Sequence, residues 1–152
     1  MQRVILAAAV LAAASAGVAS AEEFSSPVVA QQAHISSPFG QRESGSFHAG
    51  ADIAAAVGAE VRAPAAGVVR AVYAPGALDG YHGQVVEIDH GAEGRTRFSN
   101  VDSVTLAPGA RIEAGALIGR IAANDAPHVH VELWRGGRLY DPAHEITLIS
   151  AQ

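Results

Sequence analysis

Cysteine and lysine are both missing from this sequence. Without cysteine the chain has no disulfide bonds and no thiolate to offer a metal, so His, Asp and Glu are the side chains left for coordination. Without lysine there is no attachment point for biotin or lipoate. This excludes the biotinyl and lipoyl carrier domains, which have glycine-punctuated β folds of similar size.

An excess of positive charge is missing as well. Fifteen acidic residues outweigh ten arginines, which gives a formal net charge of −5. Removal of residues 1–21, whose only charged residue is Arg3, would change this to −6. Binding of nucleic acid requires clustered positive charge to neutralise phosphates. We therefore expect no nucleic acid partner.

The first 21 residues have the pattern of a secretory signal peptide. Arg3 gives a short positive start, residues 4–14 are apolar, and Ala19, Ser20 and Ala21 form a small-residue cleavage site. The apolar stretch is too short and too weakly hydrophobic for a permanent anchor, and no cysteine is present to carry a lipid. We expect an exported protein, periplasmic or secreted, with no stable membrane anchor after cleavage.

The remainder is expected to form one domain, residues 34–152, after a flexible lead-in at residues 22–33. Short apolar runs separated by glycine and proline predict an all-β domain with an antiparallel sheet, and no segment has a convincing amphipathic helix pattern. The expected strands are residues 60–63, 67–74, 84–90, 96–101, 116–122 and 128–134. Residues 57–63 and 107–115 have similar sequences, which indicates a sheet built from two similar strand–turn–strand halves.

Two short motifs about eighty residues apart carry the chemistry. The first contains His48, Gly50 and Asp52, and the second contains His128 and His130. In a strand, His128 and His130 would project from the same face, about 6.6 Å apart. One imidazole would then bind a metal while the other handles protons. Each motif alone is weak, because Asp beside glycine is ordinary turn chemistry. Together, three histidines and a carboxylate suit zinc with an open coordination position.

Several phrases follow one another in an order that resembles the lysostaphin-type, or LytM-type, peptidoglycan zinc metalloendopeptidases. The resemblance spans roughly residues 35–146, and the phrases that carry it are residues 36–42, 48–52, 64–69, 85–91, 127–132 and 140–142. It implies a β-rich fold of the duplicated hybrid type with one Zn²⁺ per chain. It also implies cleavage of peptide bonds in the stems or cross-links of peptidoglycan.

Residue by residue, the resemblance implies that His48, Asp52 and His130 are the zinc ligands. His128 matches a catalytic histidine that handles the attacking water. Three protein ligands leave one coordination position open, which is the arrangement of catalytic zinc sites.

The sequence departs from the family at a second catalytic histidine. The family usually carries a Tyr-x-His phrase on a central strand, and residues 98–100 here are Phe98, Ser99 and Asn100. Asn100 can donate a hydrogen bond to a developing oxyanion, but it cannot move a proton. The phrase at residues 123–127 is also shorter than usual, which implies a more open wall of the cleft.

The sequence therefore supports two functional hypotheses. The first is an exported zinc metalloendopeptidase that hydrolyses peptidoglycan peptide, with reduced or lost activity possible because of Asn100. The alternative is a zinc-binding, catalytically weak or silent domain that binds cell wall or regulates another wall hydrolase. The bond cleaved, the oligomeric state and the regulatory partners are not specified by these patterns.

Overall fold

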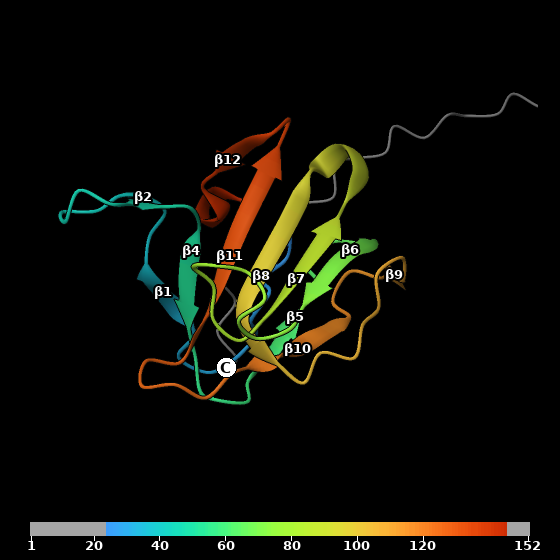
Figure 1. Cartoon of the computed structure of the whole chain (residues 1–152), viewed down its shortest axis with the longest axis horizontal. Coiled ribbons are helices and arrows are strands. Elements are labelled where there is room, and N and C mark those ends of the chain that lie inside the picture. The colour runs from blue at the N-terminus through green and yellow to red at the C-terminus, as the bar shows by residue number, and fades with distance from the viewer. Residues whose placement is uncertain (1–23, 146–152) are drawn as a thin grey trace, which may run out of the picture.

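The fold is built almost entirely from β-strands, as the computed structural model of residues 24–145 shows (Figure 1). The expected signal peptide lies outside the described residues. Twelve strands and two short 3₁₀ helices are present in the described part, and within it no helix is long and apolar enough to cross a membrane. The strands are β1 (His34–Ser37), β2 (Gly40–Gln41), β3 (Phe47–His48), β4 (Ala51–Ala54), β5 (Glu60–Arg62), β6 (Gly67–Tyr73), β7 (Gln84–Asp89), β8 (Arg95–Asp102), β9 (Arg111–Ile112), β10 (Leu117–Ile121), β11 (His128–Arg135) and β12 (Arg138–Tyr140). The 3₁₀ helices are η1 (Gly91–Glu93) and η2 (Pro142–His144).

Ten of these strands form one sheet, and β2 and β3 form a separate hairpin that projects from its side (Figure 1). The main path of the sheet runs β1-β4-β11-β8-β7-β6-β9, and all its strand pairs are antiparallel. β12 pairs with β11, and β10 pairs with both β5 and β8. The prediction of an antiparallel all-β domain is confirmed.

The two similar sequence phrases pair reciprocally. β5, from the first phrase, pairs with β10, which follows the second phrase. β9, from the second phrase, pairs with β6, which follows the first. Each half thus completes its hydrogen bonding with a strand of the other half, which is the arrangement expected of a duplicated hybrid fold.

Alternation along the central strands separates an apolar face of the sheet from a polar one. Val86, Phe98 and Val131 are opposite one another on β7, β8 and β11, and all three are 0% exposed in the main hydrophobic core. The next residues in the same register are Glu87, Arg97 and Glu132, which lie on the other face. His130 and Asp52 are paired across β11 and β4 and share that polar face. The register therefore gathers charged and titratable side chains above the core.

The described part of the expected lead-in, residues 24–33, packs against the domain in the structure. Phe24 is 3% exposed, and Val28 is 0% exposed within the main core. The backbone is fixed by hydrogen bonds from Ser25 N to Pro64 O at 2.9 Å and from Arg62 N to Pro27 O at 2.8 Å. Apolar residues in this short, polar-looking segment fill the edge of the core beside β5, which composition alone did not reveal.

Candidate metal centre

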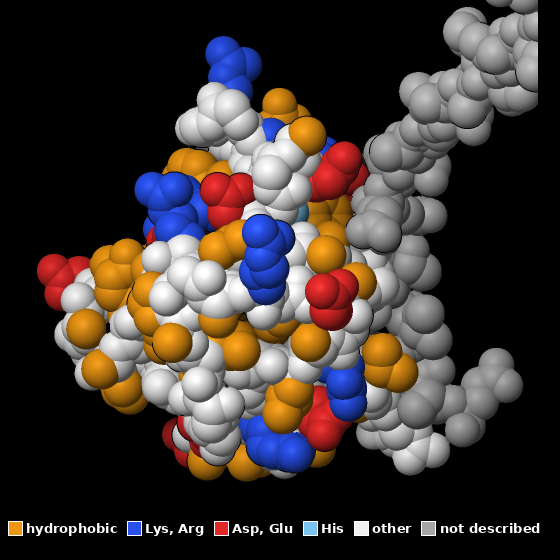
Figure 2. Space-filling view, turned by 90° about the vertical axis from the view of Figure 1, so that its right-hand side faces the viewer, with side chains coloured by type: hydrophobic (Ala, Val, Ile, Leu, Met, Phe, Trp, Pro, Cys, Tyr) orange, Lys and Arg blue, Asp and Glu red, His pale blue; other side chains and the backbone are white. Residues whose placement is uncertain are grey.

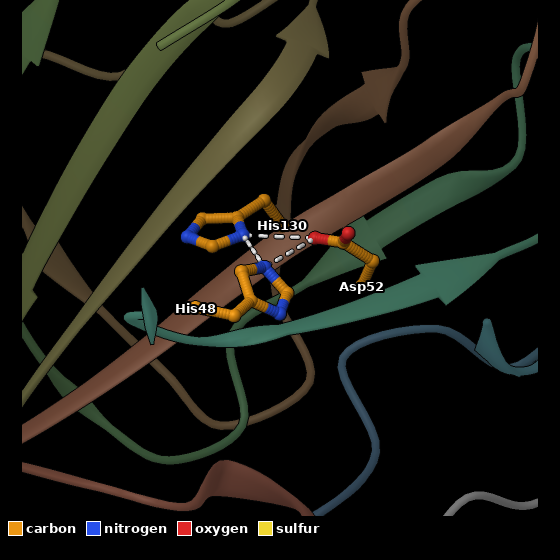
Figure 3. A group of neighbouring side chains, drawn as sticks. All are labelled: His48, Asp52 and His130. Atoms are coloured by element: carbon orange, nitrogen blue, oxygen red, sulfur yellow. Dashed lines mark hydrogen bonds and ion pairs between the residues drawn. The ribbon is translucent and has the colours of Figure 1, made fainter. Parts of the chain in front are cut away.

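His48, Asp52 and His130 meet on the polar face, where β3, β4 and β11 come together (Figure 3). Asp52 is the direct cross-strand partner of His130. Gly50 permits this approach, because a Cβ there would lie 2.2 Å from the Val131 carbonyl oxygen and 2.9 Å from His130 Cε1. The glycine in the first motif thus serves close packing of backbone on β11 rather than a turn.

Three side-chain atoms of this trio converge on one point. Asp52 Oδ1 lies 2.8 Å from His130 Nδ1 and 3.2 Å from His48 Nε2, and the two ring nitrogens are 3.1 Å apart. At zinc–nitrogen distances of about 2.0–2.1 Å, neighbouring ligands of a tetrahedral ion lie about 3.3–3.4 Å apart. The observed spacings are close to these values. A small shift of the rings would accommodate an ion between them.

The outer ring nitrogens are both held by acceptors. His48 Nδ1 donates to the Pro38 carbonyl oxygen at 2.8 Å, and His130 Nε2 faces Glu132 Oε1 at 3.4 Å. Because carbonyl and carboxylate oxygens only accept, the outer nitrogens must carry hydrogen. The inner nitrogens are then the ones left for coordination, which is how metal-binding histidines are usually oriented. The donor set therefore fits a divalent metal.

The same geometry perturbs the titration of two of these groups. Burial opposes ionisation of Asp52, but the hydrogen bond from His130 and the nearby imidazoles outweigh it and lower the pKa of Asp52. Burial likewise disfavours charge on His130, but hydrogen bonds to Asp52 and Glu132 raise its pKa to about 9. The Nδ1 proton of His130 therefore occupies the position where a metal would bind.

His128 lies beside the trio without joining it. Its Nε2 is 3.8 Å from Asp52 Oδ1, while its Nδ1 donates to the Ala126 carbonyl oxygen at 2.6 Å. Asn100 Nδ2 donates to the same Nε2 at 2.6 Å. These contacts place a lone pair of His128 at the edge of the candidate metal centre. The histidine motif thus has one imidazole inside the trio and one outside it.

Phe98 does not take part in the site. It is 0% exposed and lies in the core on the opposite face of β8 from the metal trio. A tyrosine at this position, as in the family phrase, would therefore place its hydroxyl in apolar surroundings. Only Asn100 alters the chemistry of the polar face.

Sequence reasoning missed the network behind His130. The network centres on Glu132, which shares a face of β11 with His130. Tyr81 and Trp134 donate to its carboxylate at 2.5 and 2.7 Å, and Arg97 Nη1 donates at 3.3 Å. Burial raises the pKa of Glu132, but hydrogen bonds from His130, Tyr81 and Trp134 outweigh it, so the net shift is downward. The alternation of β7, β8 and β11 was a usable signal, whereas the contribution of Tyr81 depends on a loop conformation.

Two hollows meet at Asp52 and His128, which line both. The smaller, about 260 Å³, contains the metal trio and is lined by Arg42, His48, Asp52, Gly80, Tyr81, His82, Ser99, Asn100, His128 and His130. The larger groove, about 710 Å³, is lined by Gln31, Gln32, His34, Ser36, Asp52, Ala54, Ala55, Ala56, Ala126, Pro127 and His128. Together they give a ligand access to the centre from two sides.

Arg42, on the β2–β3 hairpin, carries positive charge to the rim of the smaller hollow. Its Nη2 donates to Ser37 Oγ at 3.0 Å and lies 3.8 Å from Asp52 Oδ2. Asp52 therefore directs Oδ1 at the imidazoles of His48 and His130, and Oδ2 towards the guanidinium of Arg42. The remaining exposure of the guanidinium leaves it available to an anionic group in the cavity.

A β-sheet domain with a His/Asp/His centre in an open hollow describes a candidate metalloprotein. The model of peptidase family M23 matches residues 46–142, which include His48, Asp52, Asn100, His128 and His130. The chain therefore belongs to peptidase family M23, and the resemblance stated from the motifs is confirmed.

Known proteins with similar sequence or structure agree with this membership. A protein of Haemophilus influenzae described as an uncharacterized metalloprotease is 31% identical over 122 residues, covering 74% of this chain and 25% of its own length. A zinc-containing peptidase from Vibrio cholerae has a TM-score of 0.67 at 25% identity, covering 83% of this chain and 40% of that one. This chain thus spans a quarter of the curated relative.

The fold extends to more distant structures. The solution structure of lysostaphin, an antimicrobial peptidase from Staphylococcus simulans, has a TM-score of 0.64 at 17% identity, with 83% of this chain and 60% of that chain covered. This similarity concerns the fold alone.

Proposed function

We propose that this protein is an exported zinc metalloendopeptidase that hydrolyses peptide bonds in peptidoglycan stems or cross-links. The observation that carries the proposal is the convergence of three ligand atoms beside the imidazole of His128, which lies outside the trio. His48 Nε2, Asp52 Oδ1 and His130 Nδ1 lie 2.8–3.2 Å apart, and His128 Nε2 lies 3.8 Å from the carboxylate oxygen. Membership of a peptidase family supplies the reaction class.

In this proposal His48, Asp52 and His130 hold the zinc. A zinc ion there would act as a Lewis acid, polarising the scissile carbonyl and acidifying the attacking water. Asp52 contributes one negative charge against the two of the ion, so the centre keeps net positive charge. That charge favours the oxyanion that develops when the peptide carbonyl is attacked.

His128 is the proposed general base. The Ala126 carbonyl fixes its proton on Nδ1, so Nε2 carries the lone pair that proton abstraction requires, and the Asn100 amide that donates to Nε2 in the structure has to turn away from it before reaction. This nitrogen then returns the proton to the leaving amine. Proton transfer at one atom in both steps satisfies the requirement of peptide hydrolysis without a second histidine.

Asn100 has a different proposed role from the histidine found in the family. Its amide donates to His128 Nε2 in the structure, and during reaction the same group is available to donate to the substrate oxyanion. It cannot carry a proton. The loss of a general acid–base group typically costs about 10²–10⁴ in rate, so we expect this enzyme to be slower than a family member with the histidine.

The two hollows define a proposed path for the substrate. A peptide entering the larger groove would pass the small side chains of Ala54, Ala55 and Ala56 and cross the metal trio at Asp52. It would leave through the smaller hollow, beside Arg42 and Tyr81. Small apolar contacts on one side and a cation on the other suit the alanine-rich, carboxylate-bearing peptides of the cell wall.

The alternative is a zinc-binding domain without hydrolytic activity that binds cell wall or regulates another hydrolase. The observation that favours it is the hydrogen bond from Asn100 to His128, because it occupies the lone pair that a base would use. In this case the metal would stabilise the site, and the hollows would bind peptide without cleaving it.

Digestion of purified cross-linked peptidoglycan separates the two functions. The protein is incubated with substrate in zinc or in chelator, and products are identified by mass spectrometry. We expect new amine and carboxyl ends in zinc only, and none from His128→Gln, whose zinc content should match that of the unmodified protein. Absence of products from unmodified protein carrying one zinc per chain would contradict the enzyme and favour the silent domain.

A further inference from the structure

Glu132 is a fully buried carboxylate on the polar face of β11. It is 0% exposed, and its neighbour on the strand face is His130. A buried carboxylate is costly unless it is paired and hydrogen-bonded. Its surroundings therefore have to supply donors on both oxygens, and the identity of those donors determines what Glu132 does.

All four polar contacts of Glu132 come from donors. Oε1 is contacted by the Tyr81 hydroxyl at 2.5 Å and by His130 Nε2 at 3.4 Å. Oε2 is contacted by Trp134 Nε1 at 2.7 Å and by Arg97 Nη1 at 3.3 Å. Trp134 and Arg97 have no acceptor atoms, so neither contact can be reversed. A carboxylate, which accepts at every position, is the group that this pocket fits.

We propose that Glu132 is a positioning residue that fixes the tautomer and ring orientation of His130 for metal binding. The inference rests on the proposed role of His130 as a ligand. Glu132 requires hydrogen on Nε2 of His130, and this leaves Nδ1 as the coordinating nitrogen, facing Asp52 at 2.8 Å. Tyr81 holds the accepting oxygen in place and joins the loop between β6 and β7 to the back of the ligand.

Replacement of Glu132 by glutamine has a specific consequence in this geometry. Its amide nitrogen cannot face Trp134 and Arg97, which only donate, so it must take the place of Oε1. There the Tyr81 hydroxyl, which already accepts from Arg97 Nη1 at 2.6 Å, can accept from the amide with its second lone pair, but His130 Nε2 can accept only by losing its hydrogen. The hydrogen of neutral His130 then moves to Nδ1, the nitrogen that faces the metal position.

Glu87 provides a matched control on β7, which is separated from β11 by β8. It is 3% exposed on the same polar face and is held by arginines, with Arg97 at 2.6 and 2.9 Å. Arg95 and Arg70 lie 3.5 and 3.6 Å from its other oxygen. None of its contacts is to His48, Asp52, His130 or His128. Glu87→Gln therefore disturbs the same charge network without touching a proposed ligand.

The test measures zinc affinity by competition with a chelating dye, with thermal unfolding of the metal-free proteins alongside. We expect Glu132→Gln to bind zinc about 10–100-fold more weakly than the unmodified protein, the range seen for partners of metal-bound histidines. Glu87→Gln should bind zinc within about threefold of the unmodified protein while losing at least as much thermal stability. Equal losses of affinity in both variants, or none in Glu132→Gln, would overturn the inference.

Nuclear magnetic resonance of the histidine ring nitrogens gives a readout that a general loss of packing would not change. In zinc-loaded unmodified protein and Glu87→Gln, we expect metal on Nδ1 of His130 and hydrogen on Nε2. Metal on Nε2 would overturn the positioning role even if affinities differ as expected. An unmodified protein that binds no zinc would instead contradict the proposed function itself.

Tyr81→Phe keeps the test decisive should Glu132→Gln fail to fold. It removes one donor to Oε1 and leaves the charge of Glu132 in place. The loss of the hydrogen bond to Oε1, together with the one that the hydroxyl accepts from Arg97 Nη1 at 2.6 Å, predicts zinc binding about 2- to 10-fold weaker. Unchanged affinity in Tyr81→Phe, with the protein folded, would count against the inference.

Discussion

Asn100 combines an unusual backbone with a central position in the site. Its φ is 59°, in the left-handed region that asparagine tolerates better than most residues, and its side chain is 5% exposed. Its backbone is fixed by a hydrogen bond from Asn100 N to His82 O at 2.8 Å. The amide is thus held against His128 by the fold around it.

Asn100→His tests whether proton transfer limits the reaction. A histidine there would restore a second proton carrier, so we expect kcat on a defined peptidoglycan peptide to rise by up to about 10²–10⁴. Asn100→Gln, which also lacks a titratable group, should give no such gain. An active protein whose kcat is unchanged by Asn100→His would mean that Asn100 already substitutes fully for the histidine.

His90 reports on stability at a point remote from the metal centre. It is 8% exposed, and burial lowers its pKa despite the opposing hydrogen bond to the Ala66 carbonyl oxygen. Below the usual value of 6.5, the unfolded chain therefore binds a proton that the folded chain does not. The free energy of unfolding should fall as pH decreases from 6.5 towards the lowered pKa. Denaturant unfolding in chelator, compared with His90→Gln, should show a shallower pH dependence in the variant; equal slopes would contradict this account.

At the scale of elements, the contact between β4 and β11 controls the spacing of the proposed metal ligands. Gly50→Ala would place a methyl group 2.2 Å from the Val131 carbonyl oxygen, so the two strands would have to separate beside His130. We expect zinc affinity to fall at least about tenfold in a competition assay, by misplacement of a ligand. Gly119→Ala is the control, since its Cβ would lie 2.6 Å from the Asp102 carbonyl oxygen. That variant should lose stability but keep its zinc affinity.

The segment before β1 acts as part of the core. Val28 is 0% exposed and Val29 is 52% exposed, so adjacent valines differ almost completely in burial. Val28→Ala should lower the free energy of unfolding by roughly 1–3 kcal/mol, and Val29→Ala should change it by less than about 0.5 kcal/mol. Denaturant unfolding of the two variants measures the difference. Equal effects would show that residues 24–33 are not packed as described.

The long, regular elements and the two motifs were accessible from the sequence because their signals are local. The alternation of residues 84–90 and 128–134 predicted β7 and β11 within a residue of their ends. The two-residue strands β2, β3 and β9 were missed, since their pairing depends on tertiary contacts rather than on periodicity. Burial of Val28 and the contact of Tyr81 with Glu132 were missed for the same reason.

At the scale of the whole molecule, charged side chains are mixed on one surface, and titratable side chains cluster at the metal trio. On the face turned to the viewer in Figure 2, arginines are separated from one another among acidic and apolar side chains. Titratable groups gather instead on the polar face of the sheet, where three strands supply the metal trio.

The central claim is that His48, Asp52 and His130 hold one zinc ion while His128 stays outside the coordination sphere. A crystal structure of the zinc-loaded protein, with anomalous scattering measured on both sides of the zinc absorption edge, tests it most directly. We expect one strong peak per chain between His48 Nε2, Asp52 Oδ1 and His130 Nδ1. A peak elsewhere, or one coordinated by His128 in place of His130, would contradict the account.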